Sequence, residues 1–271
     1  MAQDGTWSVV FDGNQFAPGT YDSTISATVT DAAGNAASYT HDVHVDLESS
    51  LTVDTDSAGG DGTVNLSEMQ SGVALSGTGE AGSTVVVTVA GVSRTTTVGN
   101  DGSWTVNYAN GTLPQGTDGA TVTAVSTDAA GNTSTTSGTF HIDTEMGVAI
   151  DPNHSGGDNI VNLSESGQPL TFTGTAEPGS TVVVTLQGVD METTAGTDGV
   201  WSVTRPTGTL PSGEYNTTLT AVATDAAGNT ATSATSVRVD TEAGDVALSS
   251  SPIEGDAIIN FEEPADGVWV T

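Results

Sequence analysis

The sequence predicts an all-β protein built from tandem antiparallel sandwich domains, and three observations lead to that prediction. The 271-residue chain repeats with a period of 97, so that Asp4-Gly5-Thr6-Trp7 returns at residues 101–104 and again at 198–201. Each period contains short runs in which β-branched residues alternate with small or polar ones. Turn-forming sequences separate these runs every 8–12 residues or so. A period of this length is the size of one small domain and exceeds the unit of a solenoid.

The predicted strands follow the two-residue alternation of half-buried β-structure. Residues 84–90, 103–107 and 120–127 show it most clearly. The sequences Glu80-Ala-Gly, Asn100-Asp-Gly and Ala130-Gly-Asn between them tolerate the positive φ angles that hairpins require. No window has the 3.6-residue apolar period of a helix, so strands and turns are expected throughout. About seven short strands per roughly 100 residues indicate an immunoglobulin-like antiparallel sandwich.

Alignment of the repeats divides the chain into four parts. Residues 1–48 are the C-terminal part of one unit, 49–145 and 146–243 are complete units, and 244–271 are the N-terminal part of a fourth. We interpret the chain as a piece of a longer repetitive protein. One Trp per unit follows the Asp-Gly turn, and Trp7, Trp104 and Trp201 are expected in the cores.

The composition excludes several classes of partner. The chain has 34 acidic residues, three arginines and no lysine, for a formal charge of −31. Nucleic acid and anionic membrane surfaces would repel such a chain. There is no cysteine for a disulfide and no apolar run of 18 residues that could span a membrane. Residues 1–20 also lack the basic and apolar regions of a signal peptide.

The recurring acidic residues fall in three short stretches of each unit, and they predict calcium sites. The stretches are the Asp-Ala-Ala-Gly-Asn turn, the end of the unit and the opening of the next. Because the chain passes directly from one unit to the next, we expect the last two stretches to meet at a junction. Clustered carboxylates repel unless a cation neutralises them, and Ca²⁺ takes six to eight hard oxygen ligands. The predicted ligands are Asp31, Asp46, Glu48, Asp61, Asn65, Glu68, Asp128, Asp143, Glu145, Asp158, Asn162, Glu165, Asp225, Asp240, Glu242, Asp256, Asn260 and Glu263.

The calcium interpretation has alternatives that the residues leave open. A merely solvated acidic linker would show the same composition, and the acidic turn residues also serve as turn caps. The loop from Asp54 begins like an EF-hand, but its twelfth position is Asn65 instead of Glu, so we reject that motif. Glu80 and Glu177 are interpreted as plain turn residues. The absence of Cys and of recurring His at these positions argues against zinc or copper.

The remaining polar residues give no indication of an enzyme. His44 and His141 align with Arg238, so this position is interpreted as solvent-facing rather than as a ligand. The four histidines and scattered serines form no nucleophile–base pairing that the sequence can support.

Five motifs in a fixed order resemble a known family. They are Gly-Asp-x-x-Val-Asn-Leu-Ser-Glu, Gly-Thr-Gly-Glu-Ala-Gly-Ser-Thr-Val-Val-Val-Thr, Asp-Gly-Ser-Trp, Thr-Asp-Ala-Ala-Gly-Asn and Val-Asp-Thr-Glu. This order is similar to the bacterial Ig-like repeats in the extender regions of giant RTX-type surface adhesins and biofilm proteins. The sequence departs from the pattern at Ser249 and Ser251, which replace an acidic pair, and it lacks the glycine-rich nonapeptide of RTX β-rolls.

The resemblance implies a function for the whole segment. It implies calcium-loaded sandwiches in a head-to-tail array that holds a distal ligand-binding domain away from a bacterial cell, outside the cell and with no enzymatic activity. Its expected partners are calcium ions and neighbouring repeats. Two alternatives remain: the repeats themselves bind a glycan, ice or a host protein, or they are an accessory spacer of a secreted hydrolase.

Overall fold

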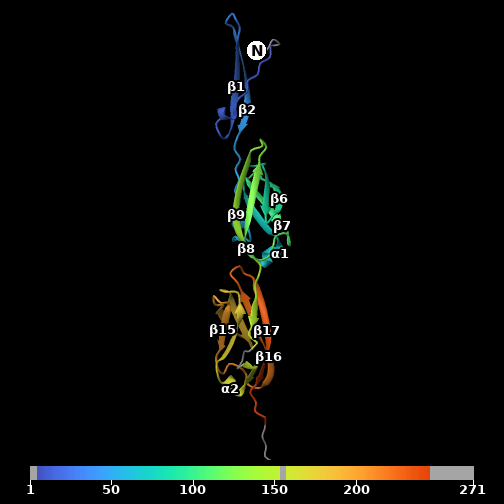
Figure 1. Ribbon diagram of the computed structural model, residues 1–271, viewed down its shortest axis with the longest axis vertical. Helices are drawn as coiled ribbons and strands as arrows, with labels where there is room; N and C mark the ends of the chain where they lie inside the picture. The colour runs from blue at the N-terminus through green and yellow to red at the C-terminus, as the bar shows by residue number, and fades with distance from the viewer. Residues whose placement is uncertain (1–4, 153–156, 245–271) are drawn as a thin grey trace, which may run out of the picture. The chain divides into compact units, whose positions relative to one another are not determined.

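A computed structural model describes residues 5–152 and 157–244 of the chain (Figure 1). The chain divides into two compact units. The first unit comprises Met1–Met146 together with the loop Thr224–Thr230, and the second comprises Gly147–Ala223 and Ala231–Thr271. The described part of the chain is mostly β-strand, as predicted. None of its helices is long and apolar enough to cross a membrane.

The first unit begins with a long two-stranded hairpin. A short 3₁₀ helix, Gly13–Gln15, precedes β1 (Thr20–Thr30), which pairs antiparallel with β2 (Ala36–Asp46). The turn between them is the first Asp-Ala-Ala-Gly-Asn sequence, and Gly34 takes a φ of +90° there. Each backbone partner along the two strands lies in register from Thr20 with Asp46 to Thr30 with Ala36.

The complete repeat of the first unit is a sandwich of seven strands among the described residues. One sheet has the order β3-β9-β8-β5-β6, and the other pairs β4 with β7. Isolated bridges from Leu51 to Gly79 and from Asp54 to Ser76 extend the smaller sheet. The elements are the 3₁₀ helix η2 (Thr55–Ser57), β3 (Thr63–Val64), α1 (Leu66–Ser71), β4 (Val73–Thr78), β5 (Thr84–Val89), β6 (Val92–Thr97), β7 (Ser103–Tyr108), β8 (Thr117–Thr127) and β9 (Thr133–Asp143).

The second unit has the same arrangement. Its five-stranded sheet has the order β11-β17-β16-β13-β14, and its smaller sheet has the order β10-β12-β15. The elements are β10 (Val148–Ile150), β11 (Ile160–Asn162), α2 (Leu163–Ser166), β12 (Leu170–Ala176), β13 (Thr181–Leu186), β14 (Val189–Thr194), β15 (Val200–Arg205), β16 (Glu214–Thr224) and β17 (Thr230–Asp240).

The prediction of antiparallel strands and turns throughout was wrong at two places in each complete repeat. β3 pairs parallel with β9, and β11 pairs parallel with β17. A short helix, α1 or α2, follows each of these parallel strands. Both helices are too short to show a helical period, and each begins with a capping box, an Asn whose side chain accepts from the backbone of a Glu three residues later.

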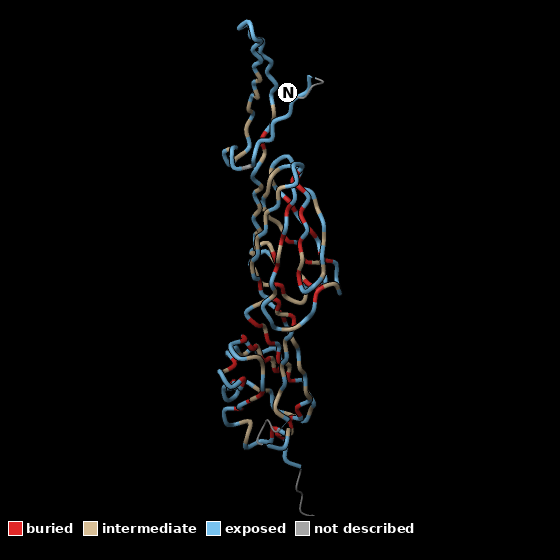
Figure 2. The backbone as a smooth tube through the Cα atoms, turned by 45° about the horizontal axis from the view of Figure 1, so that its top comes forward, coloured by how far each residue is buried: buried red, intermediate tan, exposed pale blue. Residues whose placement is uncertain are grey.

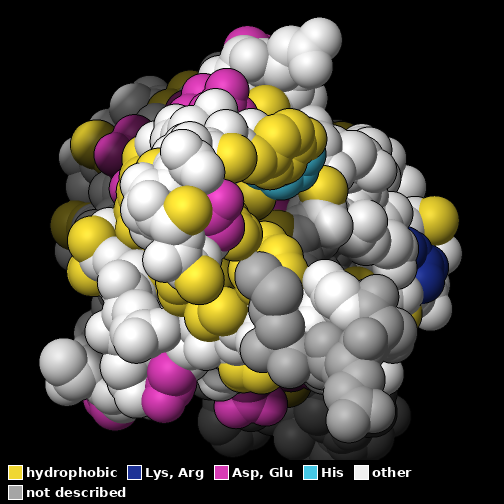
Figure 3. Space-filling model, turned by 90° about the horizontal axis from the view of Figure 1, so that it is seen from above, with side chains coloured by type: hydrophobic (Ala, Val, Ile, Leu, Met, Phe, Trp, Pro, Cys, Tyr) yellow, Lys and Arg dark blue, Asp and Glu magenta, His cyan; other side chains and the backbone are white. Residues whose placement is uncertain are grey.

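The cores form where the two sheets face each other, and Figure 2 shows buried positions alternating along the strands. Trp104 and Trp201 are 2% and 1% exposed, which confirms them as core anchors. Trp7 is 55% exposed, so its predicted burial was wrong. Trp104 packs on Gly77 of β4, and residues 1–48 contain no counterpart of that strand. Hydrophobic side chains are accordingly visible at the surface in the end view of Figure 3.

Candidate metal centre

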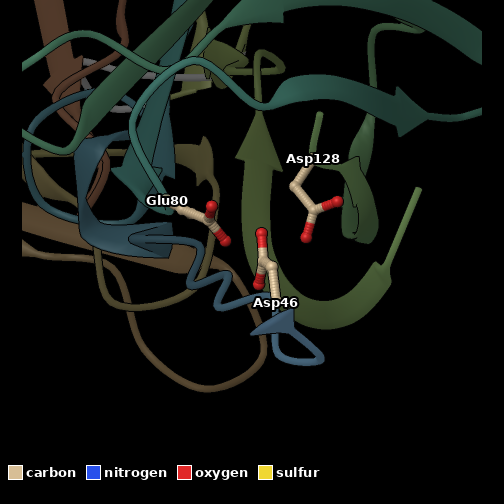
Figure 4. A group of neighbouring side chains, drawn as sticks. All are labelled: Asp46, Glu80 and Asp128. Carbon is tan, nitrogen blue, oxygen red and sulfur yellow. The ribbon is translucent and has the colours of Figure 1, made fainter. Parts of the chain in front are cut away.

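Three carboxylates converge in the first unit, and Figure 4 shows them pointing toward one another. Asp46 ends β2, Glu80 lies in the turn between β4 and β5, and Asp128 lies in the turn between β8 and β9. One oxygen from each side chain lies within 4.8 Å of the other two. Asp46 and Glu80 are half-buried, and Asp128 is 8% exposed.

Strand pairing explains why these three residues meet. β5 runs antiparallel to β8 with Thr84 opposite Thr127, so the turn before β5 lies beside the turn after β8. The chain then continues from Asp46 to Leu51, which bridges Gly79 next to Glu80. The Asn132 side chain completes the arrangement, because its amide donates to the backbone oxygen of Asp46 at 3.1 Å.

The carboxylate of Asp128 is held in its ionised form by its own turn. Burial acts to raise its pKa, but hydrogen bonds from the Asn132 side chain and from the backbone of Asn132, Gly131 and Ala130 outweigh burial, so the pKa is lowered. The Asn132 amide N–H donates to Oδ1 at 2.8 Å, and its side-chain nitrogen donates to Oδ2 at 2.9 Å. The turn therefore presents a fixed negative charge.

The pKa of Glu80 is shifted in the opposite direction, and by different causes. Burial raises the pKa of its carboxyl, and the negative charges of Asp46 and Asp128 raise it further. The ion pairs found in the described residues are His44–Asp22, Arg238–Glu214 and Arg238–Asp240, all away from these three acids. Three carboxylates without a basic partner form a site that a divalent cation would stabilise, and their hard oxygens suit Ca²⁺.

A second pair of acids, Asp143 and Asp225, repeats the arrangement of Asp46 and Asp128. Asp143 and Asp225 both belong to the first unit, and their carboxylate oxygens lie within 4.8 Å of each other. The Asn229 side chain donates to the backbone oxygen of Asp143 at 2.8 Å and to Oδ2 of Asp225 at 2.8 Å. These contacts repeat those of Asn132, and Glu177 is the sequence equivalent of Glu80, 97 residues later.

The opening acids of the complete repeat lie at the other end of its sandwich, so the expectation that they meet the preceding unit's end was wrong. Residues 51–54 run alongside β4, and β3 then pairs with His141 and Ile142 near the end of β9. The 11-residue strand β9 spans about 36 Å at about 3.3 Å per residue, and Asp61 and Asp46 lie toward its opposite ends.

Three predicted ligands of that stretch already make local hydrogen bonds. Asp61 Oδ1 accepts from the Thr63 amide at 2.9 Å. The side-chain oxygen of Asn65 accepts from the Glu68 amide at 3.0 Å, and Glu68 Oε2 accepts from the Asn65 amide at 3.0 Å. These bonds explain why the Asn and Glu recur together. Metal ligation by them stays a prediction.

The second unit places its predicted ligands in the same way. Asn162 lies opposite Asp240 in the parallel pair of β11 and β17, and Asn162 and Glu165 form the capping box of α2. Asp158 is exposed and caps the Ile160 amide at 3.0 Å, and Glu242 is exposed. The predicted ligands of the fourth part, Asp256, Asn260 and Glu263, lie outside the described residues.

Three other predicted ligands do not belong to either group of converging carboxylates. Asp31 is exposed and caps its own turn, where the Asn35 side chain lowers the pKa of the carboxyl. Glu48 is exposed and lines a shallow pocket that also includes Glu80. Glu145 is exposed directly after Asp143 and the buried Thr144. His44, His141 and Arg238 are exposed, as their alignment predicted.

Glu80 is the residue of the cluster that was not among the predicted ligands. It was interpreted as a turn residue, and it does lie in a turn. The signal that could have identified it is its recurrence as Glu177 while its neighbours change from Gly-Glu-Ala-Gly to Ala-Glu-Pro-Gly. A turn alone requires the glycine but does not require an acidic residue before it.

The two-sheet fold and the repeated turns place the chain in the class of proteins built from tandem immunoglobulin-like domains. Residues 61–143 match the family model described as bacterial Ig domain, and residues 146–241 match that of the bacterial Ig-like domain. The two complete repeats are therefore bacterial Ig-like domains. None of the curated protein sequences matches the chain.

Several solved structures are similar to the chain at the level of sequence. A 1.5-MDa bacterial ice-binding adhesin is 28% identical over 81% of this chain and 74% of that chain, with a TM-score of 0.45. A Ca²⁺-stabilized adhesin that helps an Antarctic bacterium bind ice is 31% identical over 85% and 59%, with a TM-score of 0.45. A tetra-tandem repeat from the extending region of a large adhesion protein is 27% identical over 83% and 58%, with a TM-score of 0.39. The chain thus spans less than two thirds of the last two chains.

Proposed function

We propose that this chain is a spacer segment of a bacterial surface adhesin, and that calcium bound between successive repeats stiffens it. In this proposal the repeats project a distal adhesion domain from the cell in adhesion or biofilm formation, outside the cell and without catalysis. The support is the match of both complete repeats to bacterial Ig-like families and the order of the five sequence motifs.

The observation that carries the proposal is the convergence of Asp46, Glu80 and Asp128. Asp46 comes from the end of one repeat, and the other two come from turns of the next. An ion shared by these side chains would tie the two repeats at that point. Because no ion pair among the described residues involves the three acids, the metal-free arrangement is electrostatically unfavourable, and calcium would remove that cost.

Mass action gives the expected size of the effect. Calcium modules that work outside cells have dissociation constants of about 10⁻⁴–10⁻³ M. Calcium at about 1 mM exceeds these constants by roughly 1–10 times, so each site adds about 0.4–1.4 kcal/mol to the ordered state. The upper value is an appreciable share of the net stability of a domain, which is about 5–15 kcal/mol.

Calcium titration and small-angle scattering on the whole chain test the proposal. We expect calorimetry to detect binding, and the maximum dimension to be longer in millimolar calcium than in EDTA. Glu80→Gln should weaken binding and reduce this difference. Glu192→Gln, which removes an exposed acid from β14, is the matched control and should behave like the wild type. An unchanged maximum dimension with calcium would sink the stiffening proposal.

A further inference from the structure

The loop Thr224–Thr230 contacts other residues of the first unit through hydrogen bonds that involve no carboxylate. Asn229 is 6% exposed, and its side-chain oxygen accepts from the Leu66 amide at 2.7 Å. Its side-chain nitrogen donates to the backbone oxygen of Asp143 at 2.8 Å. The Asn65 side-chain nitrogen donates to the backbone oxygen of Ala227 at 3.1 Å. Three hydrogen bonds therefore join this loop to one small surface.

That surface is formed by the Asn65 side chain, the Leu66 amide and the Asp143 carbonyl, and we name it the acceptor surface. Leu66 is the first residue of α1, so its amide has no partner inside the helix. The Asn65 side-chain oxygen is already bonded to the Glu68 amide, which leaves its nitrogen for the loop. The capping box therefore also orients the Asn65 side-chain nitrogen toward the turn of the next repeat.

The chain contains three copies of the turn, and they differ in what their Asn contacts. Asn35, Asn132 and Asn229 each bond the Asp that opens their own turn. Asn132 and Asn229 also donate to a preceding Asp carbonyl. Only Asn229, within the described residues, caps a helix amide as well. The exposed turn of Asn35 thus serves as an internal reference for an undocked turn.

The equivalent of the acceptor surface recurs in the second unit. Asn162 and Leu163 open α2 in the same way as Asn65 and Leu66 open α1, and Asp240 occupies the position of Asp143. Leu163 is 62% exposed, whereas Leu66 is half-buried. In the part of the chain that the structure describes, no residue bonds to the Leu163 amide. The second unit therefore has the groups of the acceptor surface, and no turn is bonded to them among the described residues.

We propose that the acceptor surface recognises the Asp-Ala-Ala-Gly-Asn turn of a repeat, and that it does so without metal. The Asn side chain of the turn accepts a hydrogen bond from a helix amide and donates one to a carbonyl. The Asn before the helix donates a hydrogen bond to a carbonyl of the turn. Gly228 shapes the turn that makes these contacts, because its φ of +88° is a backbone conformation that favours glycine. The surface around Asn162 and Leu163 takes the same turn from a further repeat.

Leu66→Pro tests the proposal, because it deletes the amide donor together with the Leu66 side chain. Proline is favoured at the first position of a helix. Asn65 already has the extended backbone, φ −82° and ψ 175°, that proline demands of its predecessor. Leu66→Ala removes the side chain but keeps the amide. Leu163→Pro makes the same change at α2, where the described residues offer the amide no partner.

The measurement is hydrogen exchange in EDTA, with the turns at residues 225–229 and 31–35 compared in each protein. In the wild type the docked turn should exchange several-fold more slowly than the exposed one. Leu66→Pro should accelerate the docked turn by about fivefold to tenfold, the effect of losing one hydrogen bond. Leu66→Ala and Leu163→Pro should change it far less.

A second pair of variants covers the case in which the proline variant does not fold. Asn65→Ser keeps a good helix cap and deletes the donor to Ala227, and Asn162→Ser is its control. Equal exchange in the two wild-type turns, or equal effects of Asn65→Ser and Asn162→Ser, would overturn the proposal. All these measurements are made without calcium, so a failure of the calcium proposal leaves them unaffected.

Discussion

The two complete repeats have different residues at one equivalent buried position, and these residues form different hydrogen bonds. Tyr108 and Arg205 are separated by the repeat period and lie at the ends of β7 and β15. The Tyr108 hydroxyl donates to the Val87 carbonyl at 3.0 Å, and Arg94 lies 5.5 Å from its ring centre. Arg205 is 1% exposed and donates to Leu186 and Thr209, and no carboxylate of the described residues pairs with it. Burial lowers the pKa of its guanidinium.

Arg205→Tyr should therefore stabilise the second unit. A guanidinium held only by neutral oxygens loses hydration that those bonds replace incompletely, whereas a phenol at the equivalent position is satisfied by one carbonyl. We expect a gain of about 1 kcal/mol or more in the free energy of unfolding, measured by urea denaturation. The reverse change, Tyr108→Arg, should destabilise the first unit. A loss of stability in Arg205→Tyr would contradict this explanation.

Glu80 should make the calcium-free protein less stable as the pH rises. Its folded pKa lies above the usual value of 4.5, so the folded state binds the proton more tightly than the unfolded state does. The resulting stabilisation is full below pH 4.5 and is lost as the pH rises through the folded pKa. In EDTA, we expect the melting temperature of the wild type, measured relative to that of Glu80→Gln, to fall between pH 4 and pH 7.

The Asp128 carboxyl contributes a pH dependence of stability with the opposite sign in the same experiment. Its folded pKa is below 3.8, so its contribution is present above that pH and is lost as the pH falls. Only the difference between wild type and Glu80→Gln isolates Glu80. If that difference is independent of pH, the repulsion among the three acids is too weak to support the proposed site.

At the scale of elements, the sequence predicts those strands whose alternation is long enough to read. β5, β7 and β8 were predicted from alternation, and the Trp104 position was predicted from the preceding turn. β3 and β11 were not, because two or three residues carry no period, and parallel pairing cannot be seen along the chain. The two helices could have been predicted, since Asn-Leu-Ser-Glu is a capping-box sequence.

The candidate site was predictable in its residue types and only partly in its arrangement. Asp46 and Asp128 were both among the predicted ligands, but the sequence could not fix which end of the sandwich each turn occupies. That end depends on strand register, here Thr84 opposite Thr127. The same register brings Glu80 into the site. Opening acids such as Asp61 were misplaced because an extended segment crosses the whole sandwich before β3 begins.

Gly77 should be among the least replaceable residues of β4. A Cβ there would lie 2.1 Å from the Thr52 carbonyl oxygen and 2.4 Å from Cζ2 of Trp104. Gly77→Ala should cost about 2–3 kcal/mol by overpacking, measured by urea unfolding of the whole chain. Gly119→Ala on β8 is the matched control, since a Cβ there meets nothing within 4 Å. Equal effects of the two changes would contradict the packing argument.

At the scale of the whole molecule, charge acts in two ways that experiment can separate. A formal charge of −31 makes the folded chain repel itself everywhere, and simple salt reduces that repulsion through screening over about 8–10 Å. The cluster of Asp46, Glu80 and Asp128 adds a local repulsion that screening reduces less, because part of it is buried. In the proposal, a bound cation relieves that local repulsion.

Calcium should therefore raise the melting temperature more than magnesium or sodium chloride at equal ionic strength. Magnesium demands near-ideal octahedral geometry and gives up water reluctantly, whereas calcium accepts irregular sets of oxygens. Asp128→Asn should lose the calcium-specific increment and keep the increment due to salt, and Glu192→Gln should keep both. If sodium chloride alone reproduced the effect of calcium in the wild type, the cluster would be a solvated group of acids, and the repeats would owe their stability to packing and to the Asn-mediated contacts alone.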